Sequence, residues 1–177
     1  FCLCVAWLLA LFGFCGGLYA GVKGDRRWFL SVRNATMLLG GAVLLATGSL
    51  EYLFNVSDFS IQYVWQYSNR SMDAVYRFSA LWGGMDGSML LWATILSVIS
   101  AIVAFQSKNL PRTLMPYTLA MLNSSSLFFL TVVVFLTNPF RYLHADFIPE
   151  DGNGLNPLLQ NPLMVIHPPT LYTGFTG

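Results

Sequence analysis

The sequence predicts an all-α protein, a polytopic transmembrane helical bundle. Hydrophobic residues make up 55% of the chain and charged residues only 10%, whereas a soluble domain usually has a charged fraction of about 25%. The apolar residues also collect in long runs, each close to the roughly 20 residues that cross about 30 Å of hydrocarbon as a helix. The net charge of +1 comes from scattered basic and acidic residues, which gives no reason to expect a nucleic-acid partner.

Four complete apolar runs and the start of a fifth define the expected membrane helices. The complete runs are residues 2–22, 35–54, 90–105 (with an extension back over 78–88) and 117–137, and the fifth begins at 163 and reaches 177. The chain starts at Phe1 without a methionine, and the fifth run ends without a flanking segment. We therefore expect residues 1–177 to be the membrane part of a larger protein, truncated at both ends.

The basic residues predict the orientation of these helices. Six of the nine lie in the first and third connections: Lys23, Arg26, Arg27, Arg33, Lys108 and Arg112. The positive-inside rule places those two connections in the cytoplasm. The second and fourth connections, which are the long ones, then face outward.

The second connection contains a strand-like segment at residues 59–67. Phe59, Ile61, Tyr63, Trp65 and Tyr67 alternate with more polar residues, and a period of two is typical of a half-buried strand. The prediction is a short extramembrane strand on the outer face. The alternative is an aromatic belt, since Trp and Tyr favour the headgroup region in any case. A turn at Ser68-Asn69 and a short interfacial helix over 71–81 should follow.

A glycine-rich turn comes next. Trp82-Gly83-Gly84 is followed by Gly87 and Ser88, and glycines at this density weaken a helix and permit close backbone approach. One interpretation is purely structural, a re-entry turn before the third membrane helix. The other is a platform, formed by Trp82, Gly83 and Gly84, on which a flat apolar ligand could lie.

The fifth run contains the residue on which a functional interpretation depends. His167 precedes Pro168-Pro169 near the start of this run, and an ionisable side chain in a membrane segment usually has a partner or a task. The prolines free backbone carbonyls and should hold His167 in a rigid, locally irregular turn. The other histidine, His144, lies in a polar loop, where a surface role is expected.

These motifs, taken in order, resemble the N-terminal part of CcmF-type proteins, the cytochrome c haem lyase subunits of a bacterial maturation system. The resemblance covers the whole chain. It is carried by Ser68-Asn69, Trp82-Gly83-Gly84-x-Asp86-Gly87-Ser88, Leu90-Leu91-Trp92, Asn138-Pro139-Phe140, Asp151-Gly152-x-Gly154-Leu155-Asn156-Pro157-Leu158-Leu159-Gln160-Asn161-Pro162 and His167-Pro168-Pro169-x-Leu171-Tyr172-x-Gly174.

The resemblance implies a multi-pass protein of the bacterial inner membrane, or of the mitochondrial inner membrane, with long loops facing the periplasm. It implies that His167 is an axial ligand to the iron of a transmembrane b-type haem, reduced by quinol. If Trp82, Gly83 and Gly84 do form a platform, its ligand would then be haem or quinol. The implied partners are apocytochrome c, a periplasmic haem chaperone and other cytochrome c maturation subunits. The implied chemistry is thioether formation between haem vinyl groups and cysteines, for which residues 1–177 alone are not competent.

Two features limit what the resemblance implies. Met85 and Asp86 stand where the family often has His or Gln followed by Glu, so no ligand role is expected at 85. In the family the second haem ligand and a tryptophan-rich segment lie downstream of this chain. Two other classes stay open: a proton- or substrate-coupled transporter, which would show internal repeats, and a structural subunit of a respiratory complex.

Overall fold

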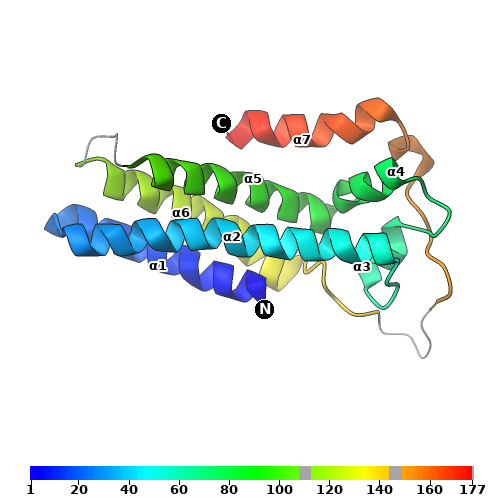
Figure 1. The fold of residues 1–177 in the computed structure, drawn as a ribbon, viewed down its shortest axis with the longest axis horizontal. Coiled ribbons are helices and arrows are strands. Elements are labelled where there is room, and N and C mark those ends of the chain that lie inside the picture. The colour runs from blue at the N-terminus through cyan, green and yellow to red at the C-terminus, as the bar shows by residue number, and fades with distance from the viewer. Residues whose placement is uncertain (108–112, 144–148, 177) are drawn as a thin grey trace.

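The computed structural model describes residues 1–107, 113–143 and 149–176, and this part of the chain is all-α without a strand. Four long segments lie side by side along the long axis (Figure 1). They are α1 (Cys2–Lys23), α2 (Arg26–Val56), α5 (Met85–Gln106) and α6 (Met115–Thr131), the last continued by the π-helix η3 (Val132–Leu136). By length and composition all four can cross a membrane. The predicted bundle of four spans is confirmed, with α7 (Pro162–Thr176) as the fifth helix.

The short elements gather at one end of the bundle. They are α3 (Gln62–Tyr67), α4 (Ala74–Ser79) and the 3-10 helices η1 (Ala80–Trp82) and η4 (Pro157–Leu159) (Figure 1). At the opposite end, α1 turns into α2 through Gly24, whose φ of 64° is left-handed. Asp25 then caps α2 by accepting a hydrogen bond from the Arg27 amide at 2.8 Å, so α2 begins nine residues before its apolar run. This early start reflects capping, which hydropathy does not detect.

The backward extension of the third membrane helix over residues 78–88 is correct for residues 85–88 and wrong for residues 78–84. Helix α5 begins at Met85, after α4 and η1 have ended. The backbone breaks there because Gly84 is extended, with φ −139° and ψ 175°.

Small residues bring the long helices together. A Cβ added to Gly17 of α1 would lie 2.9 Å from Cβ of Ala120 in α6, and one added to Gly40 of α2 would lie 2.9 Å from Cβ of Ala101 in α5. Close backbone approach of this kind is the usual basis of helix association in lipid, where the solvent is as apolar as the side chains. The glycines of these helices therefore determine which faces meet.

One buried amide joins two of the helices. The fully buried Asn123 of α6 donates from Nδ2 to Thr36 Oγ1 of α2 at 2.8 Å, and to its own helix at the Leu119 carbonyl at 2.7 Å. Its side chain also occupies the space beside Gly13 of α1. Such interhelical bonds average only about 0.6 kcal/mol in membranes, so Asn123 contributes more to register than to stability.

The predicted strand at residues 59–67 was wrong. Only Ile61 makes a β-bridge, to Tyr142, while residues 62–67 form helix α3. In the helix, Tyr63 and Tyr67 lie four residues apart on one face, and Tyr63 is buried. The prediction from the period of two was wrong because tertiary packing overrides strand propensity in so short a segment. The short helix expected over 71–81 is confirmed as α4 followed by η1.

Candidate functional site

Helix α7 carries His167, and the sequence before it determines where the helix starts. Asn161 accepts a hydrogen bond from the Leu163 amide to Oδ1 at 3.0 Å, and Pro162 occupies the first helical position. Asn156 and Pro157 start η4 in the same way, with the Leu158 amide donating to Asn156 Oδ1 at 3.0 Å. Asparagine followed by proline is a favourable start for a helix. The Asn side chain accepts a hydrogen bond from a backbone amide of the first turn, and the amide hydrogen that proline lacks would have no partner within the helix at this position. Both Asn-Pro pairs are thus capping signals.

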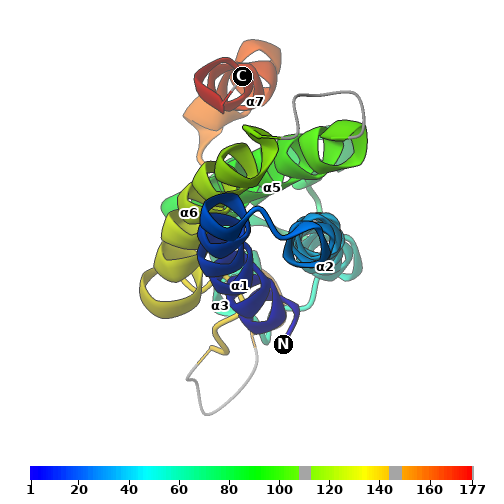
Figure 2. The same ribbon diagram turned by 90° about the vertical axis from the view of Figure 1, so that its left-hand side faces the viewer.

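Aromatic side chains attach α7 to the bundle. Trp92 of α5 stacks on Tyr172 with ring centroids 5.1 Å apart, and its ring also lies 4.7 Å from that of Phe129 in α6. A second α7 ring, Phe175, lies 6.3 Å from Trp92. Figure 2 shows α7 on the side of α5 that faces away from α1 and α2. None of the described residues of α7 is buried, so the helix keeps most of its surface open.

The structure places His167 on the open surface of α7. The imidazole is exposed and lies in a shallow groove of about 310 Å³ lined by Thr170, Leu171, Gly174 and Phe175. A Cβ on Gly174 would meet nothing within 4 Å. The groove residues recur three or four positions apart and so form one helical face, with a donor nitrogen at one end and apolar side chains beside it.

The irregular turn expected around His167 is not what the structure contains. Residues 162–176 form a continuous α-helix with Pro168 and Pro169 inside it. Each proline removes one amide donor, which leaves the carbonyls of Met164 and Val165 without their usual partners. The Thr170 hydroxyl lies 2.8 Å from the His167 carbonyl and 3.1 Å from that of Ile166. This hydroxyl supports the backbone in the turn that contains His167.

The stacking with Trp92 also locates His167 along the membrane normal. Helices α5 and α7 run in the same direction from the end that holds α3 and α4 (Figure 1). His167 precedes Tyr172 by five residues, a rise of about 7.5 Å. Because Tyr172 is level with Trp92, His167 is level with the first turn of α5, near Gly87. The imidazole therefore lies near the rim of the bundle and not at its middle.

The glycine-rich turn before α5 is held by Tyr63. The Gly84 amide donates to Tyr63 Oη at 3.0 Å, and the Tyr63 hydroxyl donates to the Leu81 carbonyl at 3.1 Å. Burial raises the pKa of Tyr63, so the hydroxyl keeps the proton that it donates. A Cβ on Gly87 would collide with the Leu81 carbonyl oxygen and with Tyr63 Oη. Gly87 is therefore required for the approach of these groups.

The protein's own side chains cover the two glycines of the predicted platform. A Cβ on Gly84 would collide with the Tyr67 ring, and one on Gly83 would lie 2.7 Å from Leu155 Cδ1. Trp82 packs edge-on against Phe78, with ring centroids 5.3 Å apart. These contacts favour the structural interpretation of the turn. Sequence reasoning missed Tyr67 and Leu155, since nothing in the chain indicates that residues so distant in sequence meet at Gly83.

The two outer connections form one unit. The Asn153 amide donates to the Trp65 carbonyl at 2.9 Å and the Gly154 amide to the Ser68 carbonyl at 3.1 Å. Gly154 has a φ of 81°, a left-handed conformation that suits glycine. The chain that leads to α7 is therefore fixed to the chain that leads to α5, so that His167 and Trp82 share one support.

Asp151 adds a carboxylate to this connection. Its Oδ1 accepts hydrogen bonds from the Arg70 amide at 2.9 Å and the Gly152 amide at 2.8 Å, and these bonds hold the pKa of the carboxyl below its usual value. A carboxyl with a lowered folded-state pKa stabilises the fold above its unfolded pKa of about 3.9. The contribution is lost as the pH falls through the folded value.

We expect Asp151→Ala to loosen the connection between the outer segments at neutral pH. Amide hydrogen exchange should accelerate at Arg70 and Gly152, because both amides lose their acceptor. In the unmodified protein, the protection of these two amides relative to their intrinsic exchange rates should fall only as the pH drops through the lowered folded-state pKa of Asp151, below the usual value of about 3.9. The control is Asp73→Ala, since Asp73 caps nothing with its side chain. Equal acceleration in the two variants would contradict this role for Asp151.

The described residues contain no group of three or more His, Cys, Asp or Glu side chains that could hold a metal ion. An axial site on a haem iron needs only one imidazole from this chain, because the porphyrin supplies the equatorial nitrogens. His167, exposed beside Leu171 and Phe175, fits one such ligand. His144 lies outside the described residues, as do Lys108 and Arg112.

Comparison with known proteins identifies relatives of the chain. Residues 82–177 match the family described as "Cytochrome C assembly protein". The chain is 39% identical over 175 residues to "Cytochrome c-type biogenesis protein CcmF" of Haemophilus influenzae, covering 99% of this chain and 26% of that protein. It is 37% identical over 175 residues to the protein of the same name from Escherichia coli, with 99% and 27% covered.

A solved structure shares the fold. "Cytochrome c Heme Lyase CcmF" aligns with a TM-score of 0.82 at 24% sequence identity, covering 99% of this chain and 27% of that one. The chain thus spans about a quarter of the length of these relatives.

Proposed function

The chain belongs to the cytochrome c assembly protein family and is similar to its CcmF-type members, and on that premise we propose that it is part of a cytochrome c haem lyase subunit. Its share of the function is to supply one axial haem ligand, His167, on a helix that the outer connections hold in place. The observation that carries the proposal is the exposed imidazole in the groove of α7. The test is the haem content and the cytochrome c yield of a His167→Ala variant of the full-length protein.

The fit of His167 to a haem iron rests on three properties. Neutral imidazole is a common axial ligand. The groove beside it is lined by Leu171 and Phe175, which suit a porphyrin face, while Gly174 adds no side chain that would block approach. A haem iron with two imidazole ligands supplies electron transfer rather than gas binding.

The depth of His167 favours a second version of this role. The family resemblance implies a resident b-type haem inside the membrane, but His167 is level with the first turn of α5 and beside the outer connections. A ligand at this rim is also suited to haem in transit from a periplasmic chaperone to apocytochrome c. In both versions His167 binds the haem iron. The two versions differ in whether haem stays bound when the protein is purified.

Among the three platform residues, Trp82 has a side-chain hydrogen-bond donor that could contact a ligand. Its indole Nε1 is buried and has no hydrogen-bond partner among the described residues. An indole donor of this kind could hold a carbonyl or carboxylate oxygen of quinone or haem. Gly83 and Gly84 contribute to the platform through the position of their backbone beside Trp82.

Membership of the cytochrome c assembly protein family supports a proposal for the partners and the location. We propose the bacterial inner membrane, with α3, α4 and the 138–161 connection on the periplasmic side, where apocytochrome c, the haem chaperone and other maturation subunits would meet the site. Quinol would be the electron donor. The transporter alternative has no comparable support, since the relatives are assembly proteins.

The orientation gives a testable prediction. Reporter fusions at Gly24 should behave as cytoplasmic because Lys23, Arg26 and Arg27 stand at that turn. Fusions at Asn69 and Gly152 should behave as periplasmic, and alkaline phosphatase activity paired with GFP fluorescence measures both. A cytoplasmic signal at Gly152 would reverse the proposed orientation.

A further inference from the structure

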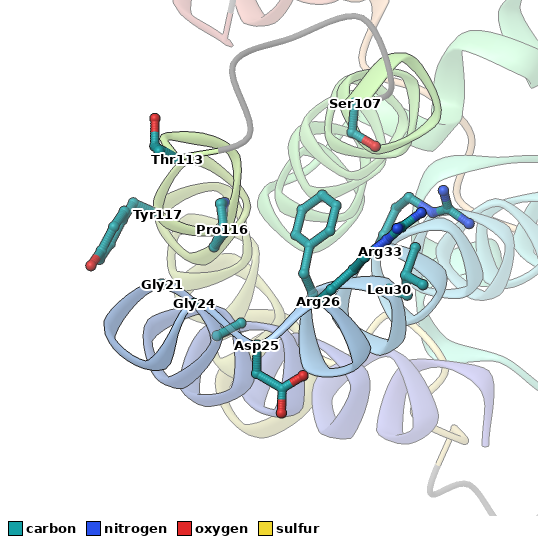
Figure 3. A pocket seen from close by; sticks show the side chains of 12 residues that line it. Gly21, Gly24, Asp25, Arg26, Leu30, Arg33, Ser107, Thr113, Pro116 and Tyr117 are labelled. Atoms are coloured by element: carbon teal, nitrogen blue, oxygen red, sulfur yellow. The ribbon is translucent and has the colours of Figure 1, made fainter.

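A cavity of about 840 Å³ lies at the end of the bundle opposite His167 (Figure 3). It is formed where α1 turns into α2, together with the end of α5 and the start of α6. Its charged and polar lining includes Asp25, Arg26, Arg33 and Ser107. Because membrane helices start and end here, the cavity lies at the level of the lipid headgroups whichever way the protein is inserted.

Two polar atoms in this lining are buried without a partner. Arg33 Nε and Ser107 Oγ make no hydrogen bond to any described residue. The only side-chain hydrogen bond of the Arg33 guanidinium in this part of the chain goes to Asn34 Oδ1 at a long 3.3 Å. An unsatisfied buried donor costs about 1–3 kcal/mol, so these groups are expected to meet an acceptor when the site is filled.

The charges around the cavity favour an anion. Arg26 and Arg33 lie seven residues apart, on the same face of α2, and both line the cavity (Figure 3). The carboxylate that lines it, Asp25, already accepts the Arg27 amide as a helix cap at 2.8 Å. The lining thus contains two guanidinium groups against one carboxylate. Phosphate oxygens only accept hydrogen bonds from such donors, and guanidinium is well suited to them.

The remaining lining indicates where the phosphate comes from. Phe29, Leu30 and Pro116 are apolar, and Tyr117 stands at the edge beside Gly21. A free phosphate ion has no apolar surface to pack against these side chains, whereas the glycerol backbone and the first methylenes of a phospholipid would pack against them. Tyrosine at this depth is also typical of the headgroup region.

We propose that this cavity binds the phosphate of an anionic phospholipid headgroup, with Arg33, Arg26 and Ser107 as its ligands. The site lies at the far end of the bundle from His167, so it serves to fix the α1–α2 and α5–α6 ends of the protein in the membrane. Basic pockets between membrane helices are a known mode of lipid recognition.

The test uses the purified full-length protein in neutral detergent, with retention of added lipid measured by native mass spectrometry. Phosphatidylglycerol should be retained more than phosphatidylcholine. Arg33→Gln should weaken its retention about fivefold, and the double variant with Arg26→Gln about 25-fold, given the usual contribution of one basic residue near anionic lipid. Ser107→Ala removes a hydroxyl without a described partner, and should weaken retention two- to threefold in a protein that folds normally.

The matched control is Arg27→Gln, one residue from Arg26 on the same helix but outside the cavity lining. It should leave phosphatidylglycerol retention unchanged. Equal loss in Arg27→Gln and Arg33→Gln would overturn the site, because retention would then depend only on surface charge. Displacement of phosphatidylglycerol by millimolar inorganic phosphate would overturn the lipid as the source of the anion.

Discussion

His167→Ala in the full-length protein should abolish cytochrome c maturation, with a yield reduced on the order of 100-fold or more. Loss of groups that merely orient a metal ligand already costs 10- to 100-fold, and this change removes the ligand itself. The variant should be inserted normally, because His167 is exposed on α7, a helix in which no described residue is buried. Holocytochrome c per unit of membrane-inserted protein is the measurement.

The haem spectrum of the purified variant separates the two versions of the role. Loss of the b-type absorption indicates a resident haem bound by His167, whereas an unchanged spectrum with failed maturation indicates haem in transit. An unchanged spectrum with normal maturation would remove the ligand assignment altogether. His144→Ala is the control for a lost histidine and should change neither quantity.

Chemical rescue makes the same prediction more specific. The groove around His167 is open, so free imidazole should reach the space vacated in a His167→Gly variant and restore part of the haem binding. Restoration by imidazole but not by a similar concentration of pyrrole would assign the function to the donor nitrogen. A structural role for the side chain would give no such selectivity.

Gly87→Ala should have the second largest effect, a marked fall in the amount of folded protein in the membrane. The added Cβ would collide with the Leu81 carbonyl oxygen and with Tyr63 Oη. The first of these is backbone and cannot rotate away, and forced overpacking costs about 1–3 kcal/mol or more. Protein level and thermal stability in detergent measure the loss.

Gly48→Ala is the matched control, since Gly48 lies within α2 and a Cβ there would meet nothing within 4 Å. Alanine is the better helix former by about 1 kcal/mol, so this variant should be as stable as the parent or slightly more so. Similar losses in both variants would show that the bundle is sensitive to any alanine in place of glycine, and that the turn at Gly87 has no special requirement.

Much of the candidate site was visible in the chain itself. His167 was identifiable because an ionisable residue in an apolar run is rare, and Asn161-Pro162 indicated where its helix should start. The strand prediction for residues 59–67 was wrong because nine residues cannot distinguish the two faces of a helix from those of a strand unless their neighbours are known. Hydropathy also missed the true starts of α2 and α5, since helices begin at caps and glycines rather than where apolar residues begin.

The sequence by itself determined that the protein crosses a membrane with several helices, and that one histidine stands near the start of the fifth. Both follow from local chemistry, because the free energy of placing a residue in lipid depends mainly on its own side chain. Only the tertiary structure decided that Tyr67 and Leu155 cover Gly84 and Gly83, that Trp92 holds α7, and that Arg33 and Ser107 line one cavity. These are contacts between segments far apart in the chain, and they depend on shape complementarity in three dimensions, which no local pattern records.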